Sequence, residues 1–268
     1  MNPKPVQVWR LLRLFVHLLW GMLLATVWLP FLRAKHRDKL VRRWSKSILN
    51  ILNVKLHVSG SVPLAGTSPA MFVSNHISWL DVWLVNSLIS PRFVAKSEVR
   101  SWPLIGWLSE KGGVIFIERA KRKDTLRVSG AALQALADGD SLCVFPEGTT
   151  TDGSFMVPFR SSLLQAAVDA EVLLRPIALR YPLPNGGVNV GVAYWGDITL
   201  WESMLAMVKQ PEIVAELVFL LPISTQGNDR RVLVRRAESA IAELLRLPVR
   251  AALVAPGGQL AGDLGAEP

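Results

Sequence analysis

The stretch MFVSNHISWLDVW, residues 71–83, joins two apolar runs through a short polar segment. Its first residues predict a buried strand, and the pattern of residues 78–88 predicts a helix. Asn75 and His76 then lie at the strand end, and Asp81 lies on the helix. An Asp five residues after a His can reach back to one imidazole nitrogen and leave the other free as a base. We therefore expect a candidate general base here; the alternative is a capping Asn75 beside a buried histidine.

Strand-like and helix-like segments alternate through the rest of the chain. The strand-like segments are residues 92–95, 114–117, 141–145, 173–180, 188–193 and 213–221. The helix-like segments are residues 123–137, 161–169, 200–209 and 229–247. This alternation predicts an α/β fold with a mixed sheet covered by helices and with sites at the strand ends. A length of 268 residues favours one substantial domain.

The positive charge of the chain is concentrated at its start. Residues 1–60 contain eleven Lys or Arg and one acid, a balance of +10, while the whole chain carries +9. The remainder is therefore close to neutral. A nucleic-acid face spread over the fold is not supported, and we expect no nucleic-acid partner.

The basic N-terminal region also carries the most apolar run. Residues 14–32 are nineteen uncharged residues, about the length of helix that crosses a bilayer core. A cleaved secretory signal would end in small residues, whereas this run meets a basic cluster. Residues 36–53 then predict an amphipathic helix of the kind that lies on anionic lipid, although such a helix can also pack on its own domain. We expect a two-helix membrane-docking segment, with a bilayer crossing and a hairpin in one leaflet both open, and the denser basic cluster on the cytoplasmic side.

Two further blocks place polar residues at strand ends. In SLCVFPEGTTTDG, residues 141–153, a strand ends at Phe145 and is followed by Glu147, Gly148 and three threonines. Free backbone N–H and hydroxyl groups there could line an oxyanion or phosphate site, although a plain turn has the same composition. The block KSEVRSWPLIGWLSEKGGVIFIER, residues 96–119, ends in Arg119, whose guanidinium could hold an anionic head group.

In this order and with these gaps, the three blocks resemble the glycerolipid (lysophospholipid) acyltransferase family, whose bacterial type member is 1-acyl-glycerol-3-phosphate acyltransferase. The likeness covers about residues 70–180. The first family motif, Asn-His followed by four residues and Asp, matches Asn75, His76 and Asp81. The other motifs match Lys96, Pro103, Gly106, Gly112 and Arg119, then Phe145, Pro146, Glu147, Gly148 and Thr149, and then Pro176.

The resemblance implies a chemistry and a set of site residues. His76, oriented by Asp81, would take the proton from the hydroxyl of a lysolipid, which attacks the thioester of acyl-CoA or acyl carrier protein without a covalent enzyme intermediate. Backbone N–H groups near Gly148 and Thr149 are candidates for the oxyanion site. The implied substrate-binding residues are Asn75, Lys96, Arg119, Glu147, Gly148, Thr149 and Thr150. Neither a cofactor nor a metal is expected.

The charge distribution, the element pattern and the resemblance together predict an organisation for the chain. We expect residues 1–55 to be a membrane-associating helical segment, residues 56–250 the acyltransferase domain and residues 251–268 a flexible tail. The protein would act on the cytoplasmic face of the inner membrane.

The third motif departs from the usual family pattern. Phosphatidate-forming members usually continue with Arg and Ser, whereas Thr150 and Thr151 stand here. We expect 1-acyl-glycerol-3-phosphate, converted to phosphatidate, as the acceptor; the missing guanidinium weakens this expectation unless Arg119 or Arg160 takes its place. The TTTDG variant also resembles enzymes that acylate lyso-ornithine lipid, which is the alternative acceptor. A membrane lipid-binding protein without turnover is the alternative from another class.

Other chemistries lack their motifs. The sequence contains no Gly-x-Ser-x-Gly, no Gly-x4-Gly-Lys and no Gly-x-Gly-x-x-Gly, so a serine hydrolase, a phosphate-loop enzyme and a dinucleotide fold are not supported. Its one cysteine, Cys143, can form no intrachain disulfide and is expected in the core. The histidines show no paired metal-ligand spacing.

Overall fold

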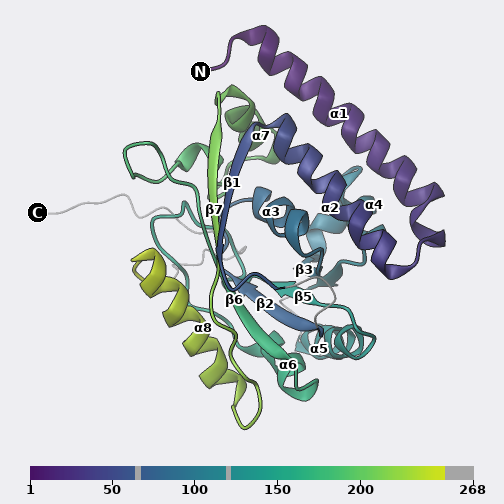
Figure 1. The fold of residues 1–268 in the computed structure, drawn as a ribbon, viewed down its shortest axis with the longest axis vertical. Helices are drawn as coiled ribbons and strands as arrows, with labels where there is room; N and C mark the ends of the chain where they lie inside the picture. The colour runs from purple at the N-terminus through teal and green to yellow at the C-terminus, as the bar shows by residue number, and fades with distance from the viewer. Residues whose placement is uncertain (64–67, 119–121, 251–268) are drawn as a thin grey trace, which may run out of the picture.

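A central β-sheet with helices on both faces forms the body of the protein (Figure 1). The structure is a computed structural model that describes residues 1–63, 68–118 and 122–250. Within these residues the sheet has seven strands in the order β1-β7-β6-β2-β5-β3-β4. The strands are β1 (Val54–Gly60), β2 (Ala70–Ser74), β3 (Arg92–Lys96), β4 (Ile115–Ile117), β5 (Leu142–Val144), β6 (Leu173–Arg180) and β7 (Ile213–Phe219).

The two faces of the sheet are covered by different helices (Figure 1). One face packs against α1 (Lys4–Val27), α2 (Ala34–Ile51), α3 (Leu80–Leu88) and α7 (Leu200–Lys209). The other packs against α5 (Arg122–Ala137), α6 (Gln165–Asp169) and α8 (Arg230–Leu245). Alternate residues of β2 enter the two cores, with Phe72 on the α3 side and Met71 and Val73 on the α5 side. The central strand is therefore buried on both faces, as its unbroken apolar run requires.

Strand direction decides where the functional loops meet. Strands β2 to β6 run parallel to one another, so their carboxyl ends share one edge of the sheet. Strand β7 runs antiparallel to β6, and β1 runs parallel to β7. The predicted α/β class and mixed sheet are confirmed. The segments that follow β2, β3, β4, β5 and β6 gather at the carboxyl edge, where α/β proteins place their sites.

Two secondary-structure predictions were wrong or incomplete. Residues 188–193 do not form a strand: Val188 makes one isolated β-bridge to Pro182, and the 3₁₀ turn η4 (Val190–Val192) follows directly. Strand β1 was not predicted. It is an edge strand whose residues after Val54 are largely exposed, so its side chains lack the apolar alternation of a half-buried strand.

Helix α1 does not coincide with the uncharged run. It begins at Lys4, ten residues before that run, and ends at Val27. The 3₁₀ turn η1 (Leu29–Phe31) follows, because Pro30 has no N–H to continue the helix. The shorter elements α4 (Ile105–Lys111), η2 (Ser97–Ser101) and η3 (Ser162–Leu164) complete the fold.

Helices α1 and α2 form an antiparallel pair held by reciprocal contacts. His17 Nε2 lies 3.0 Å from Trp44 O, and Trp44 Nε1 donates to His17 O at 3.2 Å. The two rings stack with their centroids 5.0 Å apart. The edge of the Trp44 indole packs directly against Gly21, and a Cβ added to Gly21 would lie 2.4 Å from Trp44 Cζ2. The pair is therefore fixed at van der Waals contact along the middle of α1.

The start of α1 is attached to the domain. The Arg10 guanidinium donates to Gln210 O at 2.6 Å and to Pro211 O at 3.0 Å, and Asn2 N donates to Lys209 O at 2.7 Å. Large apolar side chains remain exposed elsewhere on the helix: Val8, Trp9, Leu12, Phe15, Val16, Leu19, Trp20, Leu23 and Val27. An apolar surface of this extent on a folded domain indicates contact with a membrane or another apolar partner.

Replacement of Gly21 by Ala should weaken the α1–α2 pair. The Trp44 ring is held by a hydrogen bond and by stacking, so it cannot swing away from the added methyl group. We expect the free energy of unfolding to fall by about 1–3 kcal/mol, measured by urea denaturation in micelles. Gly130→Ala on α5 is the matched control: its Cβ would meet nothing within 4 Å, and it should gain up to about 1 kcal/mol. An equal gain in both variants would contradict this packing.

Candidate active site

The carboxyl end of β2 is fixed by Asn75. Its amide donates to Leu179 O at 2.9 Å and accepts from Leu179 N at 2.8 Å. The side chain thus continues the β2–β6 pairing after the main chain of β2 has turned away. Asn75 is buried and acts here as a structural clamp that sets where His76 leaves the sheet.

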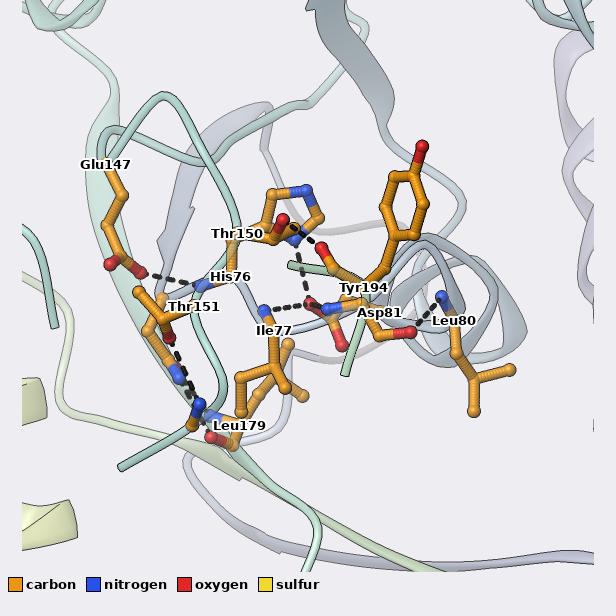
Figure 2. Close-up of polar contacts among 12 residues, drawn as sticks. His76, Ile77, Leu80, Asp81, Glu147, Thr150, Thr151, Leu179 and Tyr194 are labelled. Carbon is orange, nitrogen blue, oxygen red and sulfur yellow. Dashed lines mark hydrogen bonds and ion pairs between the residues drawn. The ribbon is translucent and has the colours of Figure 1, made fainter. Parts of the chain in front are cut away.

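Asp81 lies in the first turn of α3 and is fully buried. Its Oδ2 accepts from His76 Nδ1 at 2.8 Å and from the N–H groups of Ile77 and Ser78 at 2.8 and 2.9 Å (Figure 2). Its Oδ1 accepts from the Tyr181 hydroxyl at 2.5 Å. The carboxylate therefore closes the turn that starts α3 and at the same time fixes the imidazole.

The His76 ring is held from two directions. It stacks on Phe145 with the ring centroids 3.8 Å apart, while Nδ1 faces Asp81. A carboxylate only accepts hydrogen bonds, so Nδ1 carries the proton and Nε2 of the neutral ring has the lone pair. The second ring nitrogen points away from Asp81 in Figure 2, and 19% of the side chain is exposed. The arrangement suits a base that works on a group arriving from outside.

Glu147 ties the third block to the first. Its two oxygens accept from His76 N and Val157 N, both at 2.7 Å, and the residue is buried. Burial raises the pKa of Glu147 from 4.5 to about 8; the two N–H donors act in the opposite direction, and the charges of Asp81 and Glu238 add to the rise. Both oxygens are engaged with backbone groups, so Glu147 holds the turn in place.

The rest of the third block wraps around the His76 turn. Gly148, with φ of +76°, donates its N–H to Phe145 O at 3.1 Å. Thr151 N donates to His76 O at 3.0 Å. The Thr150 hydroxyl donates to Tyr194 O, and Tyr194 N in turn donates to Ile77 O at 2.9 Å (Figure 2). Thr149 stands between these contacts and is half-buried.

The second block is described in part. Lys96 ends β3 and is in register with Ile117 of β4, so it lies at the same edge of the sheet. Arg119 and the tail 251–268 lie outside the described residues. No group of three or more His, Cys, Asp or Glu suited to a metal occurs within the part of the chain that the structure describes. Cys143 is buried in β5, and burial raises the pKa of its thiol.

Sequence reasoning did not find Tyr181, which contacts Asp81 from the end of a distant segment. Thr151 was noted only as part of the third block, and the structure adds its contact with His76 O. Tyr181 directly follows the buried run 173–180, and a phenol at the end of such a strand is the only signal that could have marked it.

Comparison with known proteins gives the family. A family model described as Acyltransferase matches residues 55–180. Over 205 residues the chain is 34% identical to the lyso-ornithine lipid O-acyltransferase of Pseudomonas aeruginosa, which covers 76% of this chain and 78% of that protein. The chain belongs to the acyltransferase family. The acyltransferase is also 28% identical to the 1-acyl-sn-glycerol-3-phosphate acyltransferase of Neisseria gonorrhoeae over 208 residues, 77% of this chain and 81% of that one.

A solved structure has the same fold. The 1-acyl-sn-glycerophosphate acyltransferase PlsC of Thermotoga maritima superposes with a TM-score of 0.61 over 88% of this acyltransferase and 96% of that chain, at 21% identity. The comparisons identify this protein as an enzyme, an acyltransferase of the lysophospholipid type, as the motifs predicted. Helix α1 is long and apolar enough to cross a membrane by length and composition, and together with lipid acyltransferase relatives it indicates membrane association.

The burial of Glu147 should make the free energy of unfolding depend on pH. The pKa of Glu147 in the folded protein lies above that of an unfolded chain, so between about pH 4.5 and 8 only the folded state binds this proton. The contribution of Glu147 to the free energy of unfolding should therefore fall as the pH rises through this window and become constant above it. Glu147→Gln should remove this component in urea titrations from pH 5 to 9. Glu243→Gln, on the exposed face of α8, should leave the wild-type slope. Identical slopes in wild type and Glu147→Gln would contradict the burial argument.

Proposed function

We propose that this acyltransferase transfers a fatty acyl group from a thioester donor to the free hydroxyl of lyso-ornithine lipid, with His76 as the general base. The observation that carries the proposal is the buried Asp81, which occupies one nitrogen of His76 and directs the other outward beside the 145–151 turn. Donors of both expected kinds, acyl-CoA and acyl carrier protein, present the same thioester carbonyl.

The proposed reaction needs one proton carrier. His76 Nε2 accepts the proton of the acceptor hydroxyl while that oxygen attacks the thioester carbon. The tetrahedral intermediate then breaks its carbon–sulfur bond, and the departing thiolate receives the proton from His76. The Asp81 carboxylate stabilises the imidazolium that exists between these two steps. Acyl group, proton and thiol are all accounted for without a covalent enzyme intermediate.

The oxyanion of the intermediate requires a hydrogen-bond donor from the 145–151 turn. The Gly148 N–H is already used within the turn by Phe145 O. The proposal therefore assigns the role to the Thr149 backbone N–H, which is the other expected candidate. Glu147 holds this turn through His76 N and does not meet the thioester as a charge.

Lyso-ornithine lipid is the proposed acceptor because of the residue after Thr149. Phosphatidate-forming relatives usually carry an arginine there, whereas Thr150 uses its hydroxyl on Tyr194 O and brings no positive charge. Ornithine presents a carboxylate and an ammonium group in place of a phosphate monoester. The relative from Pseudomonas aeruginosa, a lyso-ornithine lipid O-acyltransferase, supports the choice.

One observation favours 1-acyl-glycerol-3-phosphate as a second candidate. A cavity of about 120 Å³ lies between the end of β4 and the third block, and Arg160 lines it beside Phe145, Pro146 and Gly148. Arg160 N also donates to Pro146 O at 3.0 Å. A guanidinium at this place could pair with a phosphate. Lys96, at the same edge of the sheet, is proposed to bind the same head group, and Arg119 keeps the head-group role expected from the sequence.

The membrane arrangement follows from the anchoring of α1. Asn2 and Arg10 tie the start of the helix to the segment before β7, and Trp44 holds its middle on α2. We propose that the segment 1–55 lies in one leaflet on the cytoplasmic face, because a crossing would separate the start of α1 from the domain 56–250. The tail 251–268 has no proposed role in catalysis.

Purified protein in lipid micelles tests the function. One labelled acyl thioester, supplied as acyl-CoA and then on acyl carrier protein, is offered with lyso-ornithine lipid, 1-acyl-glycerol-3-phosphate and a second lysophospholipid. We expect lyso-ornithine lipid to have a kcat/KM about tenfold or more above the others. His76→Ala should lower transfer to every acceptor by about 10²- to 10⁴-fold, because it removes the general base. The exposed His57→Ala is the matched control and should remain active.

Three outcomes would change the proposal. A preference for 1-acyl-glycerol-3-phosphate that Arg160→Gln removes would replace the acceptor with the second candidate. Retention of a tenth of the activity by His76→Ala would remove His76 from the role. No transfer to any acceptor from either donor would favour a lipid-binding protein without turnover.

A further inference from the structure

A tyrosine outside all four family motifs contacts the buried carboxylate of the site. Tyr181 directly follows β6, and its hydroxyl donates to Asp81 Oδ1 at 2.5 Å. The residue is 2% exposed and belongs to the core beneath α3. It stands 100 positions after Asp81 in the chain, so the sheet alone brings the two together.

The donors to Asp81 are divided unequally between its two oxygens. Oδ2 accepts from His76 Nδ1 and from two backbone N–H groups, whereas Oδ1 accepts from Tyr181 as the one donor found among the described residues. A carboxylate without solvent depends on such donors to remain charged. Loss of the phenol would leave half of the carboxylate without a partner.

Tyr181 is suited to be a permanent donor. Burial, followed by the charge of Asp81 and the hydrogen bond to it, raises the pKa of the Tyr181 phenol well above its usual range. These effects favour the protonated phenol, which is the hydrogen-bond donor. It polarises the carboxylate without competing with His76 for the proton.

The first motif places this phenol. The Asn75 side-chain amide donates to the backbone C=O of Leu179 and accepts from the backbone N–H of Leu179, two residues before Tyr181. Asn75, His76 and Asp81 are therefore held in one register with β6. The Asn189 N–H also binds Tyr181 O, which fixes the residue after the strand has ended.

We propose that Tyr181 is a positioning residue of the acyl-transfer site, which holds Asp81 ionised and in the rotamer that orients His76. The proposal rests on the general-base role proposed for His76. Tyr181 does not touch the substrate; it acts on the reaction through Asp81.

Removal of the phenol hydroxyl has a defined direction. An Asp81 carboxylate with one donor fewer is less stable as an anion, so the Asp81–His76 pair binds its proton more tightly. Compared with the wild type, the variant that lacks the hydroxyl should therefore become active at a higher pH. The titratable groups that face Asp81 are His76 from the β2–α3 turn, Cys143 from β5, Glu147 from the turn after β5 and Tyr181. These groups other than Tyr181 are common to wild type and variant, so the difference between their pH profiles isolates Tyr181.

Tyr181→Phe is the direct test, with the favoured acceptor and one acyl donor. We expect kcat to fall by about 10- to 100-fold, as loss of a hydrogen bond to a charged group predicts, with KM for either substrate changed by less than about twofold. The acid limb of the kcat profile should move up by about one pH unit. The chain has two tyrosines, so Tyr194→Phe is the matched control; its hydroxyl points away from Asp81 in Figure 2, and the acid limb should stay in place.

A second variant changes the donor in the opposite direction and keeps the hydroxyl. In the Tyr194→Phe background, 3-fluorotyrosine incorporated throughout the protein enters at Tyr181 alone. Fluorination makes the phenol a stronger hydrogen-bond donor, so the acid limb should move to lower pH. This test does not require the Tyr181→Phe protein to fold.

The outcomes separate this proposal from the function on which it rests. Opposite shifts in the two variants support the positioning role. An unmoved acid limb in both, or an equal loss of activity at every pH that follows a loss of folded protein by circular dichroism, would overturn it and leave Tyr181 as a packing residue. Activity in His76→Ala would instead overturn the general-base role itself.

Discussion

One buried carboxylate organises this protein. Asp81 has no contact with solvent, and a charge in such a place is costly unless hydrogen-bond donors surround it. Its donors come from the turn after β2 and from the end of β6, which are far apart in sequence. The fold must bring these segments together before the carboxylate is satisfied. The same contacts then leave one nitrogen of His76 directed outward.

The remaining motif residues act as supports for this centre. Asn75 links β2 to β6, and Glu147 links the His76 backbone to the chain at Val157. Thr151 connects the third block to the His76 backbone, and Thr150 connects it to the Tyr194 backbone, which in turn contacts Ile77. The sheet makes this convergence possible because β2, β5 and β6 run parallel and end at one edge. A chemistry that needs one free imidazole nitrogen thus depends on contacts made by its neighbours.

The sequence predicted what local spacing determines. The His76–Asp81 contact follows from five residues of separation across a strand–helix junction, and the α/β class follows from the alternation of segments. Tyr181 could not be predicted, because its partner is set by the β2–β6 register, to which no local pattern refers. Strand β1 was missed since an edge strand with exposed side chains has no apolar alternation. The start of α1 was also missed, because the uncharged run begins after Arg10. The Arg10 guanidinium is buried and donates to two backbone carbonyls of the domain, which no local pattern predicts.

The central claim concerns the proton on His76. The most direct measurement is nitrogen NMR of the protein labelled with ¹⁵N only in its four histidines, with His76→Ala used to assign the signal. The account predicts that the neutral His76 ring carries its proton on Nδ1, toward Asp81, and shows a pyridine-type Nε2. A neutral His76 with the proton on Nε2 would have no lone pair directed at the acceptor hydroxyl, and this result would contradict the account.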